Sequence, residues 1–246
     1  MLVFRRVNIK LRSKLLLSDL NIRILTGEVS VLAGENGVGK SSLASAIAAD
    51  TELSVEGEGG CFGVSWEGRS ALKTARSGVF LAFQNPIEIP GVPYVHFLKL
   101  VVSRCAHAVD DAHAVRLKAK LSTVCRLLKL DASLLYRPVN VGFSGGERRL
   151  FEMIQMVLME PKLCVLDEPD SGLDSGRLEA LADLILGFSV CGRAVLVITH
   201  SLKLLQLLSP DSLYCLTRSG VLRYELGVVF ESVKAAAGRC CSCLGC

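Results

Sequence analysis

A short segment early in the chain carries residue types that suit the binding of a phosphate group. It starts at Val29 as an apolar run, passes through three glycines and ends at Ser42, just before a helical pattern that begins at Leu43. A strand, a G-x-x-x-x-G-K-S loop and a helix in this order are typical of a P-loop. Glycine lets backbone N–H groups converge on one anion, and the helix adds its positive N-terminal end. The candidate ligands of the phosphates are Gly34, Asn36, Gly37, Gly39, Lys40, Ser41 and Ser42.

A pair of carboxylates later in the chain supplies the other chemistry that a phosphate site needs. Lys40 can reach terminal phosphates as a point charge, and the Ser41 hydroxyl can ligate Mg²⁺. Asp167 and Glu168 follow an apolar run of strand type, so they are expected at the carboxyl edge of a sheet, where ligands bind. Asp167 would hold Mg²⁺ through its water shell, and Glu168 could accept a proton from an attacking water.

A third motif, Ser144-Gly145-Gly146-Glu147, opens a predicted helix and allows two interpretations. Serine followed three residues later by glutamate is a capping box, which needs no ligand. The same helix start, with two glycines and a hydroxyl, is also suited to an anion, here the γ-phosphate of a nucleotide held on another subunit.

The remaining pattern predicts the elements that position these residues. Apolar and polar residues alternate in the first thirty positions, which indicates antiparallel strands, and the glycine-rich 56–60 segment is interpreted as a turn before a strand over 61–66. Two amphipathic helical patterns lie between Pro86 and Pro138. Strands and helices then alternate to the end, which predicts a parallel sheet covered on both faces.

Composition limits the class of protein. The chain has 246 residues, of which 50% are hydrophobic, and a net charge of +4 that is spread along its length. We therefore expect a large folded domain and no dedicated nucleic-acid binding. Because no secretory signal and no long apolar span is evident, the expected location is the cytoplasm.

The ten cysteines fall into two groups. Those that stand singly among apolar residues are interpreted as buried free thiols of a reducing compartment: Cys61, Cys105, Cys125, Cys164, Cys191 and Cys215. The others crowd the C-terminus as Cys240, Cys241, Cys243 and Cys246. Their spacing allows zinc, a transient cluster or a persulfide, whereas an end without ligand is the alternative.

Taken together, the motifs resemble those of the ATP-binding cassette ATPases, in the family's order and over nearly the whole chain. Gly34–Ser42 resembles Walker A, Gln84 the Q-loop glutamine and Ser144–Glu147 the signature. The segment that ends in Asp167 and Glu168 resembles Walker B, and His200 resembles the switch histidine. One further segment resembles the D-loop: Ser171, Gly172, Leu173 and Asp174.

The resemblance implies a single α/β domain of the P-loop NTPase type. Residues 1–84 and 144–238 would form the catalytic lobe, with an N-terminal antiparallel β subdomain, and residues 85–143 an inserted helical subdomain. Residues 239–246 would be a Cys-rich tail. The expected sheet is mainly parallel and flanked by helices.

The resemblance also implies how the site works. Two chains would close head to tail on two Mg-ATP molecules, and each site would take its P-loop from one subunit and its signature from the other. Glu168 would be the general base, Gln84 would sense Mg²⁺ and the attacking water, and His200 would contact the γ-phosphate. The family usually stacks adenine on an early aromatic residue, which the segment from Lys10 to Lys14 lacks, so Lys10 or Leu11 would give only loose packing.

Within the family, the segment from Phe83 to Val92 is similar to that of SufC-like ATPases of iron-sulfur cluster assembly. This implies SufB-like and SufD-like scaffold partners that dock near Pro86 to Pro93, with no direct membrane insertion. A nucleotide-binding subunit of a membrane transporter is the alternative function, and a regulatory ATP-dependent clamp is a third.

Two arginines, Arg148 and Arg149, follow the signature-like motif and leave two arrangements open. One arginine could fold against Glu168 or Asp170 in the free subunit and hold the base away from water. Otherwise both are solvated on their helix.

Overall fold

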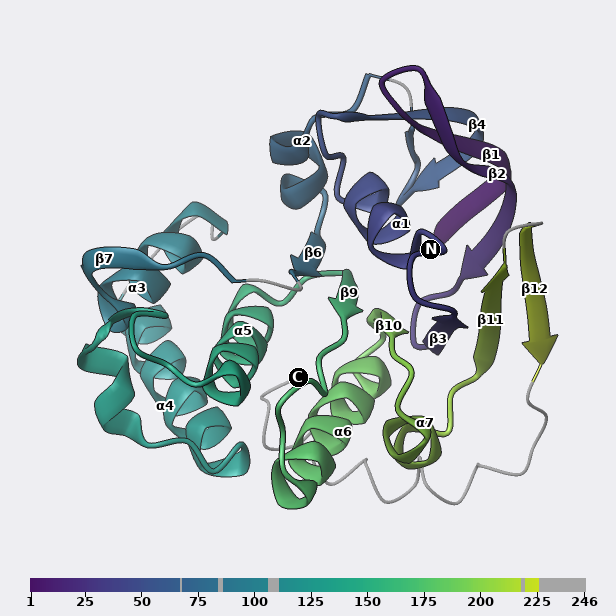
Figure 1. Ribbon diagram of the computed structural model, residues 1–246. Coiled ribbons are helices and arrows are strands. Elements are labelled where there is room, and N and C mark those ends of the chain that lie inside the picture. Colours follow the sequence, from purple (N-terminus) through teal and green to yellow (C-terminus); the bar gives the residue numbers. More distant parts are fainter. Residues whose placement is uncertain (67, 84–85, 106–110, 218–219, 226–246) are drawn as a thin grey trace.

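The structure is a computed structural model that describes residues 1–66, 68–83, 86–105, 111–217 and 220–225 (Figure 1). Its strands are β1 (Leu2–Leu11), β2 (Lys14–Ile24), β3 (Val29–Gly34), β4 (Leu53–Cys61), β5 (Val64–Ser65), β6 (Val79–Ala82), β7 (Ile89–Pro93), β8 (Pro138–Val139), β9 (Leu163–Asp167), β10 (Ala194–Ile198), β11 (Ser212–Thr217) and β12 (Gly220–Glu225). Its helices are α1 (Lys40–Ile47), α2 (Ala71–Arg76), α3 (Tyr94–Cys105), α4 (Asp111–Leu127), the 3-10 helix η1 (Ala132–Tyr136), α5 (Gly145–Met159), α6 (Ser175–Val190) and α7 (Leu202–Leu208).

A mainly parallel sheet forms the centre of the molecule. Its strand order is β12-β11-β3-β10-β9-β6, and only β12 runs antiparallel to its neighbour. Both faces of the sheet are buried, since Val195 and Val197 of β10 point into one core and Leu196 into the other. This explains why these strands read as continuous apolar runs. The predicted α/β fold is confirmed.

A second, antiparallel sheet with the order β2-β1-β4-β5 packs over one face of the central sheet, with α1 between them. The interpretation of residues 56–60 as a turn is wrong, because they lie inside β4. Gly57 and Gly59 are there because β1 passes very close: a Cβ at Gly59 would lie 2.2 Å from the Val3 carbonyl oxygen. Close backbone approach, and not chain reversal, accounts for these glycines.

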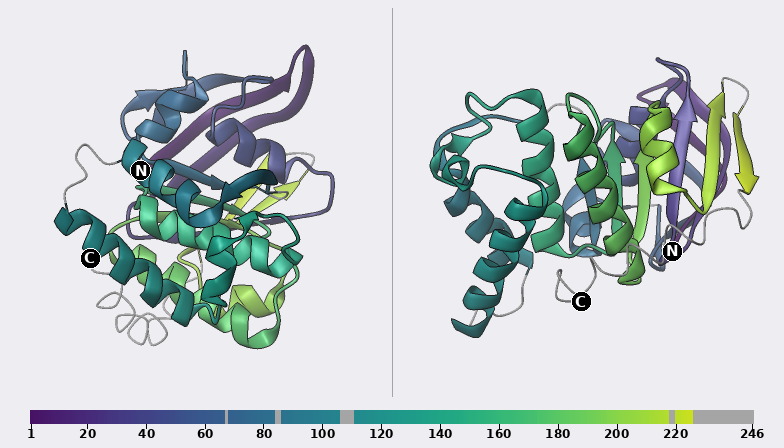
Figure 2. Two further views of the ribbon diagram at one scale, coloured as in Figure 1. Left: turned by 90° about the vertical axis from the view of Figure 1, so that its left-hand side faces the viewer. Right: turned by 90° about the horizontal axis from the view of Figure 1, so that it is seen from below.

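The opposite face of the central sheet is covered by α5 and α6, and α7 adds to the same core (Figure 2). Between β6 and α5 the chain forms β7, α3, α4, η1 and β8, which gather on one side of the molecule (Figure 1). Leu98 and Val102 of α3, Val124 of α4 and Leu128 just after α4 are buried in the same core as α5. The amphipathic patterns predicted for this part are thereby explained.

Free thiols are confirmed for Cys61, Cys125, Cys164 and Cys215, and the first three are buried. The expectation is wrong for Cys191, which is disulfide-bonded. The four C-terminal cysteines lie outside the described residues. Within the described part of the chain, none of the helices has the length and apolar character needed to cross a membrane.

Candidate nucleotide site

The predicted phosphate loop joins β3 to α1 as expected. Gly37 and Gly39 have positive φ angles of 78° and 107°. Gly34 passes so close to β11 that a Cβ there would lie 2.5 Å from the Leu216 carbonyl oxygen. Each of these conformations or contacts favours glycine. The loop geometry therefore depends on the residue types that the motif supplies.

Lys40 closes back over its own loop. Its side chain is 7% exposed, and Nζ donates to the carbonyl oxygens of Gly34 at 2.8 Å and of Glu35 at 2.9 Å. The ammonium group is thus held above the loop by two neutral acceptors, which a phosphate oxygen can replace with a stronger, charge-assisted bond.

The end of β9 brings the first predicted carboxylate to the loop. Asp167 is 4% exposed, and its carboxylate accepts a hydrogen bond from the Ser41 hydroxyl. Burial raises the pKa of Asp167, while the bond from Ser41 and the charge of Lys40 oppose this rise. A hydroxyl and a carboxylate side by side are oxygen donors of the kind that fits Mg²⁺.

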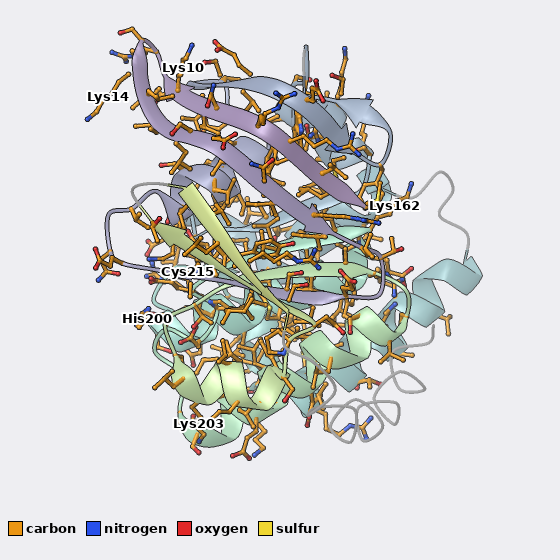
Figure 3. The ribbon with its side chains drawn as sticks, turned by 90° about the vertical axis from the view of Figure 1, so that its right-hand side faces the viewer. Lys10, Lys14, Lys162, His200, Lys203 and Cys215 are labelled. Carbon is orange, nitrogen blue, oxygen red and sulfur yellow. The ribbon has the colours of Figure 1, made fainter. Side chains whose placement is uncertain are left out.

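The next residue, Glu168, turns out of the strand in a left-handed conformation with φ 49°. Its N–H donates to the carbonyl oxygen of Ile198, at the end of the neighbouring β10, at 2.9 Å. Its carboxylate Oε1 lies 3.6 Å from Nδ1 of His200, which is largely exposed. A sparsely populated backbone conformation at this position aims the side chain away from the strand axis. Figure 3 labels His200 near the start of α7, on which Lys203 lies.

A second link joins the same two strand ends. The buried hydroxyl of Thr199 donates to Oδ1 of Asp170 at 2.8 Å and accepts the N–H of Ser201 at 3.0 Å. The segments that follow β9 and β10 are therefore tied together by two hydrogen bonds next to the Glu168–His200 pair, so we expect a shift of one segment to be transmitted to the other.

The Ser144–Glu147 turn begins α5 and forms the predicted capping box. The N–H of Glu147 donates to Ser144 Oγ at 3.2 Å, and Oε2 of Glu147 accepts the N–H of Ser144 at 2.8 Å. This second bond lowers the pKa of Glu147. Ser144 is exposed, and its hydroxyl also donates a hydrogen bond to the Glu147 carboxylate, so an outside acceptor would have to replace that carboxylate. The capping-box interpretation is confirmed, and the anion-binding interpretation stays a prediction.

The D-loop residues pack directly on this turn. A Cβ at Gly146 would lie 2.6 Å from the carbonyl oxygen of Gly172, so the two loops touch through their backbones.

The rest of the D-loop is held by the core and by the start of α6. Leu173 packs against the core, and Asp174 caps α6 by accepting the N–H groups of Gly176 and Arg177. Ser171 begins this loop, with its N–H bonded to the carbonyl oxygen of Glu168.

Each of the two arginines after the signature-like turn forms an ion pair with a carboxylate. Neither of these carboxylates lies in the loop that carries Glu168 and Asp170. Arg148 forms an ion pair with Glu88 at 2.6 Å. Arg149 is 6% exposed and pairs with Glu152 at 3.3 Å, so the expectation that both are solvated is wrong. Arg149 also donates to the carbonyl oxygen of Phe83, and Glu152 accepts the N–H of Phe83. Gln84, which follows Phe83, lies outside the described residues.

A cavity of about 290 Å³ lies beside the P-loop, between β2 and the adjoining ends of β11 and β12. It is lined by Leu15, Leu16, Leu17, Ser18, Leu20, Gly37, Val38, Leu216, Thr217 and Gly220. Neither Lys10 nor Leu11 is among these residues, and Lys10 instead pairs with Glu56 at 2.7 Å (Figure 3). Sequence reasoning missed β11 because it is remote in the chain, although its parallel pairing with β3 brings it to the P-loop.

Comparison with known proteins decides the family. A family model described as ABC transporter matches residues 17–171, which is more than half of the chain. The chain belongs to the ABC transporter family. Its matched region begins in β2 and ends in the D-loop, so it contains the phosphate loop, the signature turn and the Asp167–Glu168 pair.

Relatives of this ABC protein include two that are named SufC and others named ycf16. It is 33% identical to "Probable ATP-dependent transporter SufC" of Escherichia coli (strain K12), over 91% of each chain. It is 37% identical to "Probable ATP-dependent transporter ycf16" of Cyanidium caldarium, over 89% of this chain and 86% of the relative. It is 34% identical to "Iron-sulfur cluster assembly protein SufC" of Plasmodium berghei (strain Anka), over 85% of this chain and 58% of the relative.

Solved ABC structures share the fold. "Structure of ATP binding subunit of ABC transporter" matches with a TM-score of 0.79 at 22% identity and covers 96% of this chain and 99% of the other. A structure described as a dimeric post-hydrolysis state of the ATP-binding cassette MJ0796, bound to ADP and Pi, matches with a TM-score of 0.77 at 19% identity, over 93% of this chain and 100% of the other.

Proposed function

We propose that this ABC-type ATPase hydrolyses ATP to drive conformational change in an iron-sulfur cluster assembly scaffold of the SufBCD type. The observation that carries the ATPase chemistry is the meeting of the P-loop with the ends of β9 and β10, where Asp167, Glu168 and His200 lie. Relatives of the SufC type, at 33% and 34% identity, support the choice of scaffold.

In this proposal the bound nucleotide lies with its phosphates over the P-loop. Lys40 exchanges its two carbonyl acceptors for phosphate oxygens, and the backbone N–H groups of the glycines neutralise further charge. Ser41 and Asp167 would hold Mg²⁺, with Gln84 as a third ligand. When bound, the metal ion supplies Lewis-acid stabilisation of the charge on the phosphates.

Glu168 is proposed as the general base that takes a proton from the attacking water, and His200 as the residue that orients it and contacts the γ-phosphate. Their separation of 3.6 Å allows a hydrogen bond after a small rotation. The exposed imidazole is positioned at the surface where a second subunit would close the site.

The Ser144–Glu147 turn is proposed to act in trans, in an ATP-dependent homodimer. The exposed Ser144 hydroxyl and the N-terminal end of α5 would meet the γ-phosphate held by the other subunit. The D-loop, from Ser171 to Asp174, lies against this turn and would cross the same interface. A site split between chains makes hydrolysis conditional on association.

We propose that SufB-like and SufD-like scaffold proteins dock near Pro86 to Pro93. Ile87 is 77% exposed, and Pro90 and Gly91 beside it are exposed too. Prolines restrict the free loop, which lowers the entropy lost on binding. The proposed division of the chain follows from this: residues 1–84 and 144–238 are catalytic, and the 85–143 insertion receives the partner.

A nucleotide-binding subunit of an ABC membrane transporter is the second candidate, favoured by the names of the matching family and structures. Affinity purification of the tagged chain from its own cells, followed by mass spectrometry, separates the two. Recovery of soluble SufB-like and SufD-like proteins supports the scaffold, whereas recovery of an integral permease contradicts it.

A pair of variants makes this test specific for the loop. Ile87→Asp places a charge in the proposed contact and should abolish recovery of the scaffold proteins. Leu72→Asp is the matched control, since Leu72 on α2 is also a largely exposed apolar residue, at 61%. Equal recovery with both variants would show that the partner binds elsewhere.

A further inference from the structure

One side chain connects the proposed docking loop to the signature turn. Arg148 donates from Nε to the carbonyl oxygen of Phe143 at 3.1 Å and from Nη2 to Oε1 of Glu88 at 2.6 Å. Phe143 immediately precedes Ser144, the cap of α5, and Glu88 follows the exposed Ile87. The planar guanidinium, held at two of its nitrogens, is fixed in orientation between the two segments.

The backbones on either side of this link are already fixed to each other. The buried amide of Asn140 donates to the carbonyl oxygen of Ile87 at 2.7 Å, and Ile89 pairs with Val139 in the β7–β8 ladder. The docking loop and the strand that leads into the signature turn therefore form one unit. A displacement of the loop therefore displaces the strand, and the reverse also holds.

The far end of the loop is attached to the body of α5. Tyr94 follows Pro93, is fully buried, and donates its hydroxyl to the carbonyl oxygen of Phe151 at 3.0 Å. The rings of Tyr94 and Phe151 are 4.4 Å apart. Tyr94 thus anchors one end of the docking loop to the middle of α5. Near the other end, Glu88 connects the loop through Arg148 to the turn that begins α5. The Glu88 side chain is partly exposed, so both water and a partner can reach it.

We infer that Arg148 is a positioning residue that couples the docking loop to the signature turn, and that Glu88 is its contact on the loop. A partner that seats on Ile87 and moves Glu88 shifts Arg148, and with it the Phe143 carbonyl that fixes the start of the turn. The identity of that partner rests on the proposed function, but the coupling itself is a property of this chain alone.

The competing explanation is an ordinary surface ion pair. Glu88 is 45% and Arg148 30% exposed, and pairs of this kind are often weak. The two explanations differ in what loss of the Glu88 carboxylate does to the signature turn. An ordinary pair affects only the loop around Glu88, whereas a coupling pair also alters the hydrogen bond from the Glu147 N–H to Ser144 Oγ.

Hydrogen exchange on the isolated chain tests the coupling without any partner. Glu88→Ala and Arg148→Ala should each speed amide exchange over residues 144–148 about fivefold, and the double variant should stay within twofold of the Arg148→Ala variant, because both changes remove the same link. Glu56→Lys, which disrupts the exposed pair with Lys10 on the other sheet, is the control and should leave these amides unchanged. Circular dichroism and thermal melting check that each variant is folded.

Dimer formation provides the second measurement. In a Glu168→Gln background with Mg-ATP, sedimentation should show weaker dimers for each single alanine variant and no further weakening for the double. Additive effects of the two changes in both measurements would overturn the inference. Failure to recover scaffold proteins from cells, with both readouts still non-additive, would refute only the proposed partner.

Discussion

Nδ1 of His200 lies 3.6 Å from Oε1 of Glu168, and the Thr199 hydroxyl, one residue before His200, is bonded to Asp170, two residues after Glu168. The proposed base and the proposed switch residue thus come from the ends of two adjacent parallel strands that are fixed to each other. We expect the two side chains to move together when a nucleotide enters the site.

Glu168→Gln should reduce the ATPase rate by about 10²- to 10⁴-fold, because the amide cannot accept the proton of the attacking water. ATP binding and ATP-dependent dimerisation should persist. Lys40→Ala, in contrast, should abolish ATP binding itself, because the only ammonium of the P-loop is lost. Steady-state hydrolysis and nucleotide titrations distinguish these states, and normal hydrolysis by Glu168→Gln would exclude Glu168 as the base.

Ser144 can be tested apart from its role as a helix cap. Asp is as good a cap as Ser, so Ser144→Asp should keep thermal stability close to that of the original chain. The carboxylate would then face the γ-phosphate of the opposite subunit and should abolish hydrolysis and dimer formation by repulsion. Ser144→Ala should lose about 1 kcal/mol of stability as well. Full activity of Ser144→Asp would limit Ser144 to its structural role.

Base selectivity should be weak. The described residues that line the cavity beside the P-loop are aliphatic or small, and stacking on an aromatic ring is worth about 1–3 kcal/mol per base. We expect kcat/KM for ATP and GTP to differ by less than about tenfold, because a mostly aliphatic lining has few groups that distinguish the hydrogen-bonding edges of the two purines. Leu15→Tyr, at a half-exposed position of the lining, should tighten nucleotide binding. A strong preference for ATP would place the base elsewhere.

Titration of the Glu152 carboxyl makes the free energy of unfolding depend on pH. Burial raises its pKa to about 7, although Arg149 and the Phe83 N–H oppose the rise. In the unfolded chain the carboxyl titrates near 4.5. Between these values the folded state binds more protons, so stability falls as the pH rises from about 4.5 to about 7, by at most about 1.4 kcal/mol per pH unit.

Denaturant unfolding at several pH values checks this slope. Glu152→Gln removes the titration, so the variant should gain stability relative to the original chain as the pH rises toward 7. Asp183→Asn, at a carboxylate on α6, serves as a comparison because its pKa is raised by partial burial outside the Arg149 pair. Parallel pH profiles for the original chain and Glu152→Gln would contradict the assignment.

The parts of the site that sequence predicted are those whose geometry is local. The P-loop, the capping box of Ser144 and the strand before Asp167 each depend on residues within a few positions of one another, so spacing alone specifies them. The same holds for the burial of β10, which follows from its run of apolar residues on both faces.

The features that were missed depend on approach between distant segments. Gly57 and Gly59 gave a turn signal, but the close passage of β1 places them in a strand. The cavity lining at Leu216 and the ion pair between Glu88 and Arg148 join positions far apart in the chain, and no local pattern specifies such pairs. The positive φ of Glu168 likewise accompanies a hydrogen bond to Ile198 at the end of the neighbouring strand, 30 positions along the chain.

The central claim, that each ATP site is shared between two chains, is tested most directly by mixing two inactive variants. Lys40→Ala lacks a working P-loop and Ser144→Asp lacks a working signature turn, so neither should hydrolyse ATP alone. In a mixed head-to-tail dimer, one of the two sites combines the intact P-loop of one chain with the intact turn of the other. An equal mixture should therefore recover up to about a quarter of the original rate. A mixture as inactive as its components would contradict the account.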